Sequence, residues 1–154
     1  MPSSSTSADR GGGWVVAQFV LMAVILGLSA APPDWPGWVR LTGAPIALVG
    51  LLGIIWSFRV LGSSLTPYPR PLDDAVLAES GPYGLVRHPI YGAGTLLFVG
   101  AALVASVPAT IAALALPVLW YFKARVEERY LSERFPDYAD YRRRVRRRLI
   151  PYVL

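Results

Sequence analysis

The chain contains no cysteine among its 154 residues, and its only histidine is His88. The absence of cysteine excludes disulfides, cysteine-based metal sites and thiol nucleophiles, and a single histidine excludes an all-histidine metal site. Charged residues are also scarce, at 16% of the chain, against about 25% in soluble domains. Hydrophobic residues make up 54%. We therefore expect one integral membrane domain with no bound metal.

The net charge of +5 is concentrated near the C-terminus. Residues 123–148 contain ten Lys/Arg and five Asp/Glu, whereas the rest of the chain contains five of each. A basic tail beside apolar segments typically binds anionic lipid headgroups on the cytoplasmic side. Nucleic-acid binding is the other interpretation of such a run, but the apolar composition argues against it. We expect lipid headgroups, and no nucleic acid, as partners of this tail.

Four apolar runs predict an all-α fold, an integral membrane bundle of about four transmembrane helices. Residues 1–13 are rich in Ser and Gly, so we expect a disordered start followed by a single membrane domain over 14–154. The expected spans are 14–31, 41–61, 90–107 and 109–122. The last helix is expected to continue without a break to about 134, well beyond the hydrocarbon layer. This predicts a C-terminal helical hairpin with a polar extension.

Positively charged residues predict the orientation of these spans. With four spans, both chain ends lie on the same side as the loop over 62–89. That side holds fourteen of the fifteen Lys/Arg, and only Arg40 lies opposite. By the positive-inside rule, both ends and this loop are cytoplasmic.

The only histidine lies in the stretch Gly81-Pro82-Tyr83-Gly84-Leu85-Val86-Arg87-His88-Pro89-Ile90-Tyr91-Gly92. In an antiparallel hairpin this stretch meets the end of the last helix, which carries Glu127 and Glu128. Adjacent carboxylates at a membrane boundary require solvent or cations, and Arg87, Lys123 and Arg125 are the expected cations. The sequence thus predicts a polar pocket open to the cytoplasm and walled by apolar helix. Such a pocket suits a water-soluble cationic cofactor facing a lipid-dissolved substrate.

Two motifs carry a family resemblance: Val86-Arg87-His88-Pro89-Ile90-Tyr91-Gly92 and Arg125-Val126-Glu127-Glu128-Arg129-Tyr130-Leu131. In this order they resemble the isoprenylcysteine carboxyl methyltransferases and the related membrane phospholipid methyltransferases, over residues 59–151. The resemblance implies transfer of a methyl group from S-adenosylmethionine (AdoMet) to a lipid-like or small hydrophobic acceptor. O-methylation of an isoprenylcysteine-type carboxylate is favoured, and N-methylation of a phospholipid is the other option. The cofactor-binding part would be residues 62–151.

The resemblance also implies which residues form the site. The expected cofactor contacts are Tyr83, Val86, Arg87, His88, Pro89, Tyr91, Gly92, Arg125, Glu127 and Glu128. Glu127 and Glu128 would hold the amino group or the ribose hydroxyls, and Arg87 would bind a carboxylate or orient the loop. Arg87 and Glu128 are the expected catalytic residues. A carboxylate acceptor requires no general base, whereas an amine or thiol could lose its proton to Glu128 or His88.

Two other functions remain alternatives. Membrane sterol and steroid reductases that use NADPH share a similar Arg-His-Pro-x-Tyr segment, but the paired glutamates fit them less well. A non-enzymatic lipid-binding or scaffold protein would account for the apolar helices alone. Among the remaining features, Gly94 and Gly100 are expected to pack helices. Tyr138 and Tyr141 are expected to anchor the tail at the interface.

Overall fold

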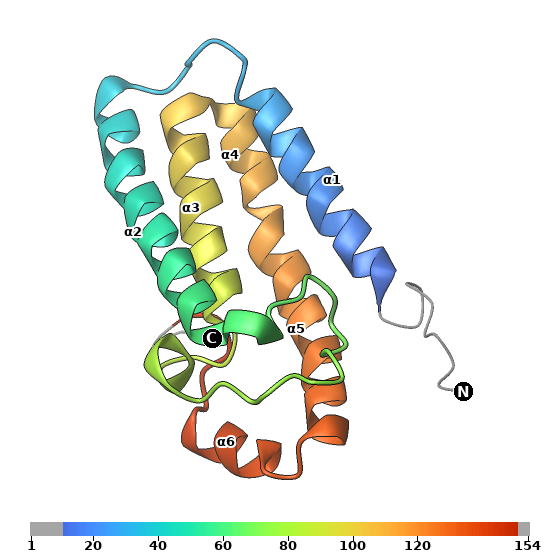
Figure 1. Cartoon of the computed structure of the whole chain (residues 1–154). Coiled ribbons are helices and arrows are strands. Elements are labelled where there is room, and N and C mark those ends of the chain that lie inside the picture. Colours follow the sequence, from blue (N-terminus) through green and yellow to red (C-terminus); the bar gives the residue numbers. More distant parts are fainter. Residues whose placement is uncertain (1–10, 151–154) are drawn as a thin grey trace.

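The computed structural model describes residues 11–150, so most of the segment expected to be disordered, 1–13, lies outside the described residues. Four apolar rods run side by side: α1 (Gly12–Leu28), α2 (Gly37–Leu61), α3 (Pro89–Ala105), and α4 (Val107–Ala113) continued by α5 (Ala115–Arg134) (Figure 1). The short η1 (Gly62–Ser64), η2 (Gly81–Gly84) and α6 (Tyr138–Arg144) lie at one end. Residues 11–150 contain no strand, so the all-α prediction is confirmed. The end of the bundle that carries η1, η2 and α6 is formed by residues 62–88 and 123–150, and we call it the polar end.

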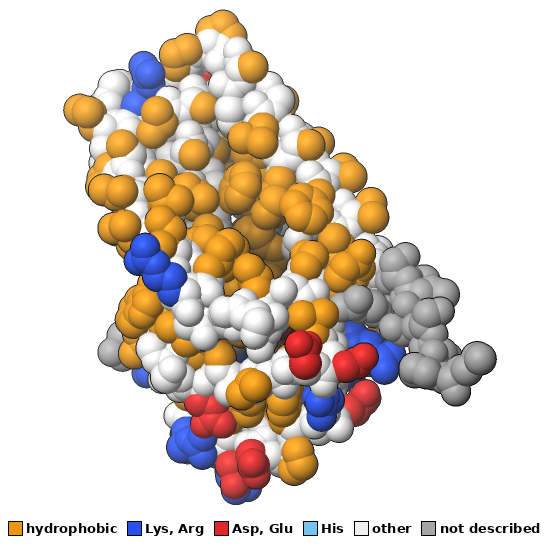
Figure 2. Space-filling model, in the orientation of Figure 1, with side chains coloured by type: hydrophobic (Ala, Val, Ile, Leu, Met, Phe, Trp, Pro, Cys, Tyr) orange, Lys and Arg blue, Asp and Glu red, His pale blue; other side chains and the backbone are white. Residues whose placement is uncertain are grey.

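The bundle presents apolar side chains outward. Two segments are long and apolar enough to cross a membrane, Gly37–Ser64 and Val107–Arg134, and α1 and α3 are shorter apolar helices. Little of α2 is buried. Figure 2 shows hydrophobic side chains over the helical part of the molecule and most charged side chains gathered at the polar end. Exposed apolar surface of this extent marks an interaction site, and lipid is the partner that suits whole helices.

Glycines bring α2 and α3 into close contact. A Cβ on Gly50 would lie 2.3 Å from the backbone nitrogen of Leu97, and a Cβ on Gly100 would lie 2.3 Å from that of Ala47. Backbones approach this closely only where the interface residues are small. Gly94 similarly accommodates the ring of Trp120, which a Cβ would meet at 2.7 Å. The prediction that Gly94 and Gly100 pack helices is confirmed.

The last predicted helix is interrupted at Leu114, where an unbroken helix was expected. Pro117 explains the interruption. It has no amide hydrogen, and its ring collides with the carbonyl of the residue four positions earlier, Ala113. At the start of this rod, the Ser106 hydroxyl accepts a hydrogen bond from the Ala109 amide and caps α4. At the other end α5 stops at Arg134, just before Phe135-Pro136, as predicted.

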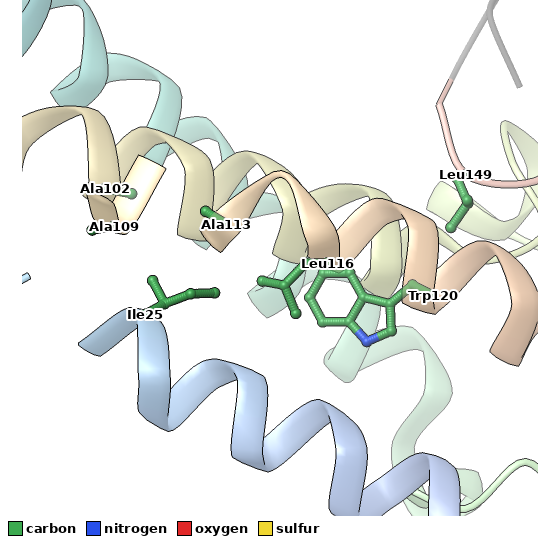
Figure 3. Packing of buried hydrophobic residues seen from close by; sticks show 7 residues of the cluster. All are labelled: Ile25, Ala102, Ala109, Ala113, Leu116, Trp120 and Leu149. Carbon is green, nitrogen blue, oxygen red and sulfur yellow. The ribbon is translucent and has the colours of Figure 1, made fainter. Parts of the chain in front are cut away.

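Small residues let α1 pack on α4 and α5. Ile25 of α1 is 2% exposed and points toward Leu116 of α5 (Figure 3). Ala109 and Ala113 of α4 belong to the same cluster, and Leu149 joins it from the C-terminal segment. In lipid this attachment rests on close van der Waals contact. It places α1 beside the part of α5 that leads into the polar end.

Candidate functional site

Glu128 is the centre of a buried ionic cluster. Its Oε1 accepts hydrogen bonds from Arg87 Nε at 2.8 Å and Arg148 Nε at 3.0 Å, and its Oε2 accepts one from Arg148 Nη2 at 2.9 Å. His88 Nε2 lies 3.3 Å from Oε1. Two guanidinium groups on one carboxylate hold it in the ionised form. The hydrogen bond to Glu128 also raises the pKa of Arg148. We call Arg87, His88, Glu128 and Arg148 the Glu128 cluster.

Arg87 also holds the C-terminal segment in place. Its Nη1 donates to the carbonyl oxygens of Val145 at 2.8 Å and Arg146 at 2.6 Å. The backbone amide of Arg87 donates to the Arg147 carbonyl at 2.9 Å, and that of His88 donates to the Arg148 carbonyl at 2.8 Å. The stretch around His88 is thus fixed by α5 through Glu128 and by the C-terminal segment through its backbone.

Gly92 allows the C-terminal segment to pass the start of α3. A Cβ at this position would lie 2.0 Å from the carbonyl oxygen of Leu149. No side chain fits at that distance, because the obstacle is backbone. Glycine is therefore required here for a close approach between two segments, and Gly92 lies behind the wall of the cavity described next.

Glu127 faces a cavity. Its Oε2 accepts a hydrogen bond from the Tyr91 hydroxyl at 2.7 Å and lies 3.7 Å from His88 Nδ1. The rings of His88 and Tyr91 are stacked with centroids 5.5 Å apart, and Tyr91 stacks in turn on Trp120 at 5.7 Å. The Glu127 side chain remains 26% exposed. Adjacent in sequence, the two glutamates thus face different surroundings.

The cavity has a volume of about 380 Å³ and two kinds of wall. Its polar lining includes Arg87, His88, Tyr91 and Glu127. Apolar side chains from α1, α2 and α3 form much of the remainder: Phe19, Met22, Ile54, Phe58 and Phe98. Figure 2 shows a hollow walled by hydrophobic side chains on this face, between α1 and α2. A polar group and an apolar surface therefore share one space.

Two buried hydroxyl groups in the cavity wall have no hydrogen-bond partner among residues 11–150. They belong to Tyr83, which is 7% exposed, and Tyr138, which is 1% exposed. Leaving such a group unsatisfied costs about 1–3 kcal/mol, so a ligand or water partner is expected. Burial raises the pKa of both tyrosines, so their hydroxyls remain neutral. These are the clearest unused binding groups of the site.

The interpretation of Tyr138 and Tyr141 as interfacial anchors is wrong. Both are buried and line the cavity, and the Tyr141 hydroxyl donates to the Tyr83 carbonyl at 2.8 Å. They pack against Leu131 and Phe135 at the turn between α5 and α6. Packing between α5, α6 and the loop overrides the interfacial preference of the isolated side chains.

Six of the ten predicted cofactor contacts line the cavity: Tyr83, Arg87, His88, Pro89, Tyr91 and Glu127. The other four do not. Val86 is buried, Gly92 is covered by Leu149, and Arg125 is exposed on the outer face of α5. Both oxygens of Glu128 are occupied by arginines. Contact between these four residues and a cofactor stays a prediction, and in the described structure Glu128 and Gly92 support the segments that form the cavity.

Several residues of the site were missed or misplaced by sequence reasoning. Lys123 was expected near the glutamates, and it lines the same cavity as Glu127. Its hydrogen bonds, which were not predicted, go to Gln18 Oε1 at 2.5 Å and to the Pro67 carbonyl at 2.8 Å. Gln18 was not predicted, although an amide inside an apolar run is a signal of function or packing. Arg148 was grouped with headgroup-binding residues and instead pairs with Glu128. Lipid binding by the remaining tail stays a prediction.

Comparison with known proteins places the chain in a family. It is 36% identical over 139 residues to the cobalt-zinc-cadmium resistance protein CzcN of Cupriavidus metallidurans, covering 88% of this chain and 61% of that protein. It is 33% identical over 145 residues to the nickel-cobalt-cadmium resistance protein NccN of Alcaligenes xylosoxydans xylosoxydans, covering 92% and 64%. The chain thus spans less than two thirds of the length of these relatives. Residues 38–138 match the sequence model of the phospholipid methyltransferases. The chain therefore belongs to the phospholipid methyltransferase family.

Proposed function

We propose that this protein is an AdoMet-dependent integral membrane methyltransferase that acts on a lipid-like or small hydrophobic acceptor. The observation that carries the proposal is the cavity, which joins the polar group of Glu127, His88 and Tyr91 to an apolar wall. Family membership supports methyl transfer as the reaction. The names of the two relatives concern metal resistance, but residues 11–150 contain no group of three or more metal-binding side chains. We propose no metal site.

The polar part of the cavity fits AdoMet. The Glu127 carboxylate can accept hydrogen bonds from an amino group or from ribose hydroxyls, and Tyr83 and Tyr138 offer unused hydroxyls. When bound, AdoMet supplies a methyl group whose carbon–sulfur bond breaks, leaving its electron pair on sulfur, as a lone pair of the acceptor bonds to the carbon.

The chain contributes alignment and exclusion of water. A displacement of this kind depends on orientation and a dry approach more than on proton transfer. Arg87 acts as a positioning residue, because its guanidinium is held by Glu128 and two backbone carbonyls and it directly precedes His88. If the acceptor is an amine or thiol, His88 is the base that lines the cavity, whereas Glu128 does not. A carboxylate acceptor loses no proton.

The apolar opening supports an acceptor that arrives from the lipid. O-methylation of an isoprenylcysteine-type carboxylate is our first choice, and N-methylation of a phospholipid is the second. We further propose that all four rods span the membrane with both chain ends in the cytoplasm. The 17 residues of α1 and of α3 correspond to about 26 Å of helix, close to the ~30 Å hydrocarbon layer. The distribution of Lys and Arg supports this orientation.

Replacing Glu127 by Gln is expected to weaken AdoMet binding by about 10- to 100-fold, because a hydrogen bond to a charged group is lost. Isothermal titration of the protein in nanodiscs measures the affinity. Glu133→Gln is the matched control, because Glu133 is exposed on the same helix. Unchanged affinity in Glu127→Gln contradicts the proposed site. Binding of NADPH in place of AdoMet by the wild type would support the reductase alternative.

Removing the hydroxyls of Tyr138 and Tyr141 should change stability in opposite directions. Tyr138→Phe deletes a buried hydroxyl without a partner and should raise the unfolding temperature of the ligand-free protein. Tyr141→Phe breaks the bond to the Tyr83 carbonyl and should destabilise by about 1–3 kcal/mol. Thermal unfolding followed by tryptophan fluorescence measures both. A loss of stability in Tyr138→Phe equal to that in Tyr141→Phe would show that the Tyr138 hydroxyl has a protein partner.

A further inference from the structure

Lys123 is a buried cation whose hydrogen-bond acceptors are neutral. It is 1% exposed, and its Nζ donates to the Gln18 side-chain amide and the Pro67 carbonyl. None of the ion pairs formed within residues 11–150 includes Lys123. Burying a charge without an ion-pair partner is costly. Glu127 acts on the ammonium group electrostatically without forming an ion pair with it, so an anion from outside the chain that reaches the ammonium group would stabilise its charge.

The position of Lys123 is imposed by its neighbours. A lysine near a membrane boundary normally extends toward water, but here Gln18 of α1 and Pro67 of the loop hold its end group inside. Gln18 Oε1 also accepts a hydrogen bond from Trp120 Nε1 at 3.3 Å, which fixes the amide. Two segments distant in sequence therefore retain the ammonium group at one place. A lysine exposed to solvent would need neither the Gln18 amide nor the Pro67 carbonyl as a hydrogen-bond partner.

Lys123 lines the same cavity as the polar group and the apolar side chains. Lys123 precedes Glu127 by four residues on α5, so it shares the same helix face about 6 Å further into the bundle. Its Nζ lies 5.3 Å from the centroid of the Tyr91 ring, and the hydroxyl of that ring bonds to Glu127. A ligand that contacts Glu127 and the apolar wall therefore occupies a cavity that Lys123 also lines.

We propose that Lys123 binds a carboxylate of a ligand in this cavity and selects ligands that carry one. An ammonium group has three donors, and two are used by Gln18 and Pro67. Under the proposed function, on which this identification of ligands rests, the carboxylate belongs either to the head of the acceptor or to the methionine part of AdoMet. Lys123 is bonded to Gln18 of α1, the helix that also contributes Phe19 and Met22 to the apolar wall, and this favours the acceptor.

Two pairs of probes that differ in a carboxylate test the proposal: tetradecanoate against 1-tetradecanol, and AdoMet against decarboxylated AdoMet. Binding of each is measured to the full-length protein in nanodiscs. The wild type should prefer the carboxylate member of at least one pair by about tenfold or more. Lys123→Met should abolish that preference, and Lys123→Arg should retain part of it. The pair that loses its preference identifies the source of the carboxylate.

A purely structural role for Lys123 predicts a different result. If Lys123 only ties α1 to α5, then Lys123→Met weakens all four probes alike, as Gln18→Leu does by loosening α1. That result overturns the proposal, and so does a wild type without preference in either pair. If the wild type does not bind AdoMet at all, the proposed function fails, while the tetradecanoate pair still tests Lys123. The wild-type and Lys123→Arg measurements decide the matter should Lys123→Met not fold.

Discussion

Replacing Glu128 by Gln lowers the free energy of unfolding by about 3–5 kcal/mol, the range expected when one partner of a buried ion pair is removed. Glu128 is the counter-charge that Arg87 and Arg148 share, and its side chain is 6% exposed. Glutamine removes the charge and turns an amide donor toward guanidinium donors. The buried Arg87 and the partly buried Arg148 then lose their shared carboxylate, at the point where α5 meets the His88 stretch and the C-terminal segment.

Thermal unfolding in detergent, followed by intrinsic tryptophan fluorescence, measures this loss. The chain has five tryptophans and no cysteine, so thiol-reactive dyes would report nothing. Glu133→Gln on the exposed face of α5 should stay within about 0.5 kcal/mol of the wild type. If Glu128→Gln unfolds at the same temperature as this control, the Glu128 cluster does not hold the polar end together.

Replacing Gly92 by Ala is expected to displace the C-terminal segment. The new Cβ would meet the Leu149 carbonyl oxygen at 2.0 Å, and that oxygen is a backbone atom that no side-chain rotation can move aside. The C-terminal segment must therefore move. Its movement breaks the hydrogen bonds that the Arg87 and His88 amides donate to it, and it draws Arg148 away from Glu128. Overpacking and lost hydrogen bonds together should cost about 3 kcal/mol or more. AdoMet affinity should fall as well, because the His88 stretch loses its support.

Trypsin provides a second readout for Gly92→Ala, because the segment is rich in arginine. Its cleavage should be faster in the variant than in the wild type. Gly27→Ala is the control, since a Cβ on Gly27 meets nothing within 4 Å and alanine favours a helix by up to about 1 kcal/mol. Equal cleavage rates and equal unfolding temperatures in Gly92→Ala and the wild type would contradict the described path of the segment.

The helices were predictable because apolar runs and their breaking residues are local features. The starts and ends of α2 and α3 differ from the predicted spans by a few residues. The interruption before Pro117 was missed because the run around it is apolar throughout. The proline itself was a signal in the sequence, since it has no amide hydrogen to donate within a helix. The short α6 could not be predicted. A helix of seven residues is marginal alone and forms here because Tyr138 and Tyr141 are buried.

The site was predictable as a meeting of two motifs but not in its details. Successive residues on a helix point about 100° apart, so the sequence could not tell which of Glu127 and Glu128 faces the cavity. That depends on the C-terminal segment, which brings Arg148 to Glu128 through tertiary packing. Gln18 is the one detail of the site that the sequence could have indicated, since a lone amide in an apolar run is a signal of function or packing.

Transfer of a labelled methyl group tests the central claim most directly. The protein in nanodiscs is incubated with AdoMet labelled on its methyl carbon and with two acceptors, an isoprenylated cysteine and phosphatidylethanolamine. We predict that the wild type labels one of these acceptors, the isoprenylated cysteine being our first choice, and that Glu127→Gln labels it at least about tenfold less. Absence of both AdoMet binding and labelled product in the wild type, or equal labelling by the variant, would contradict the account.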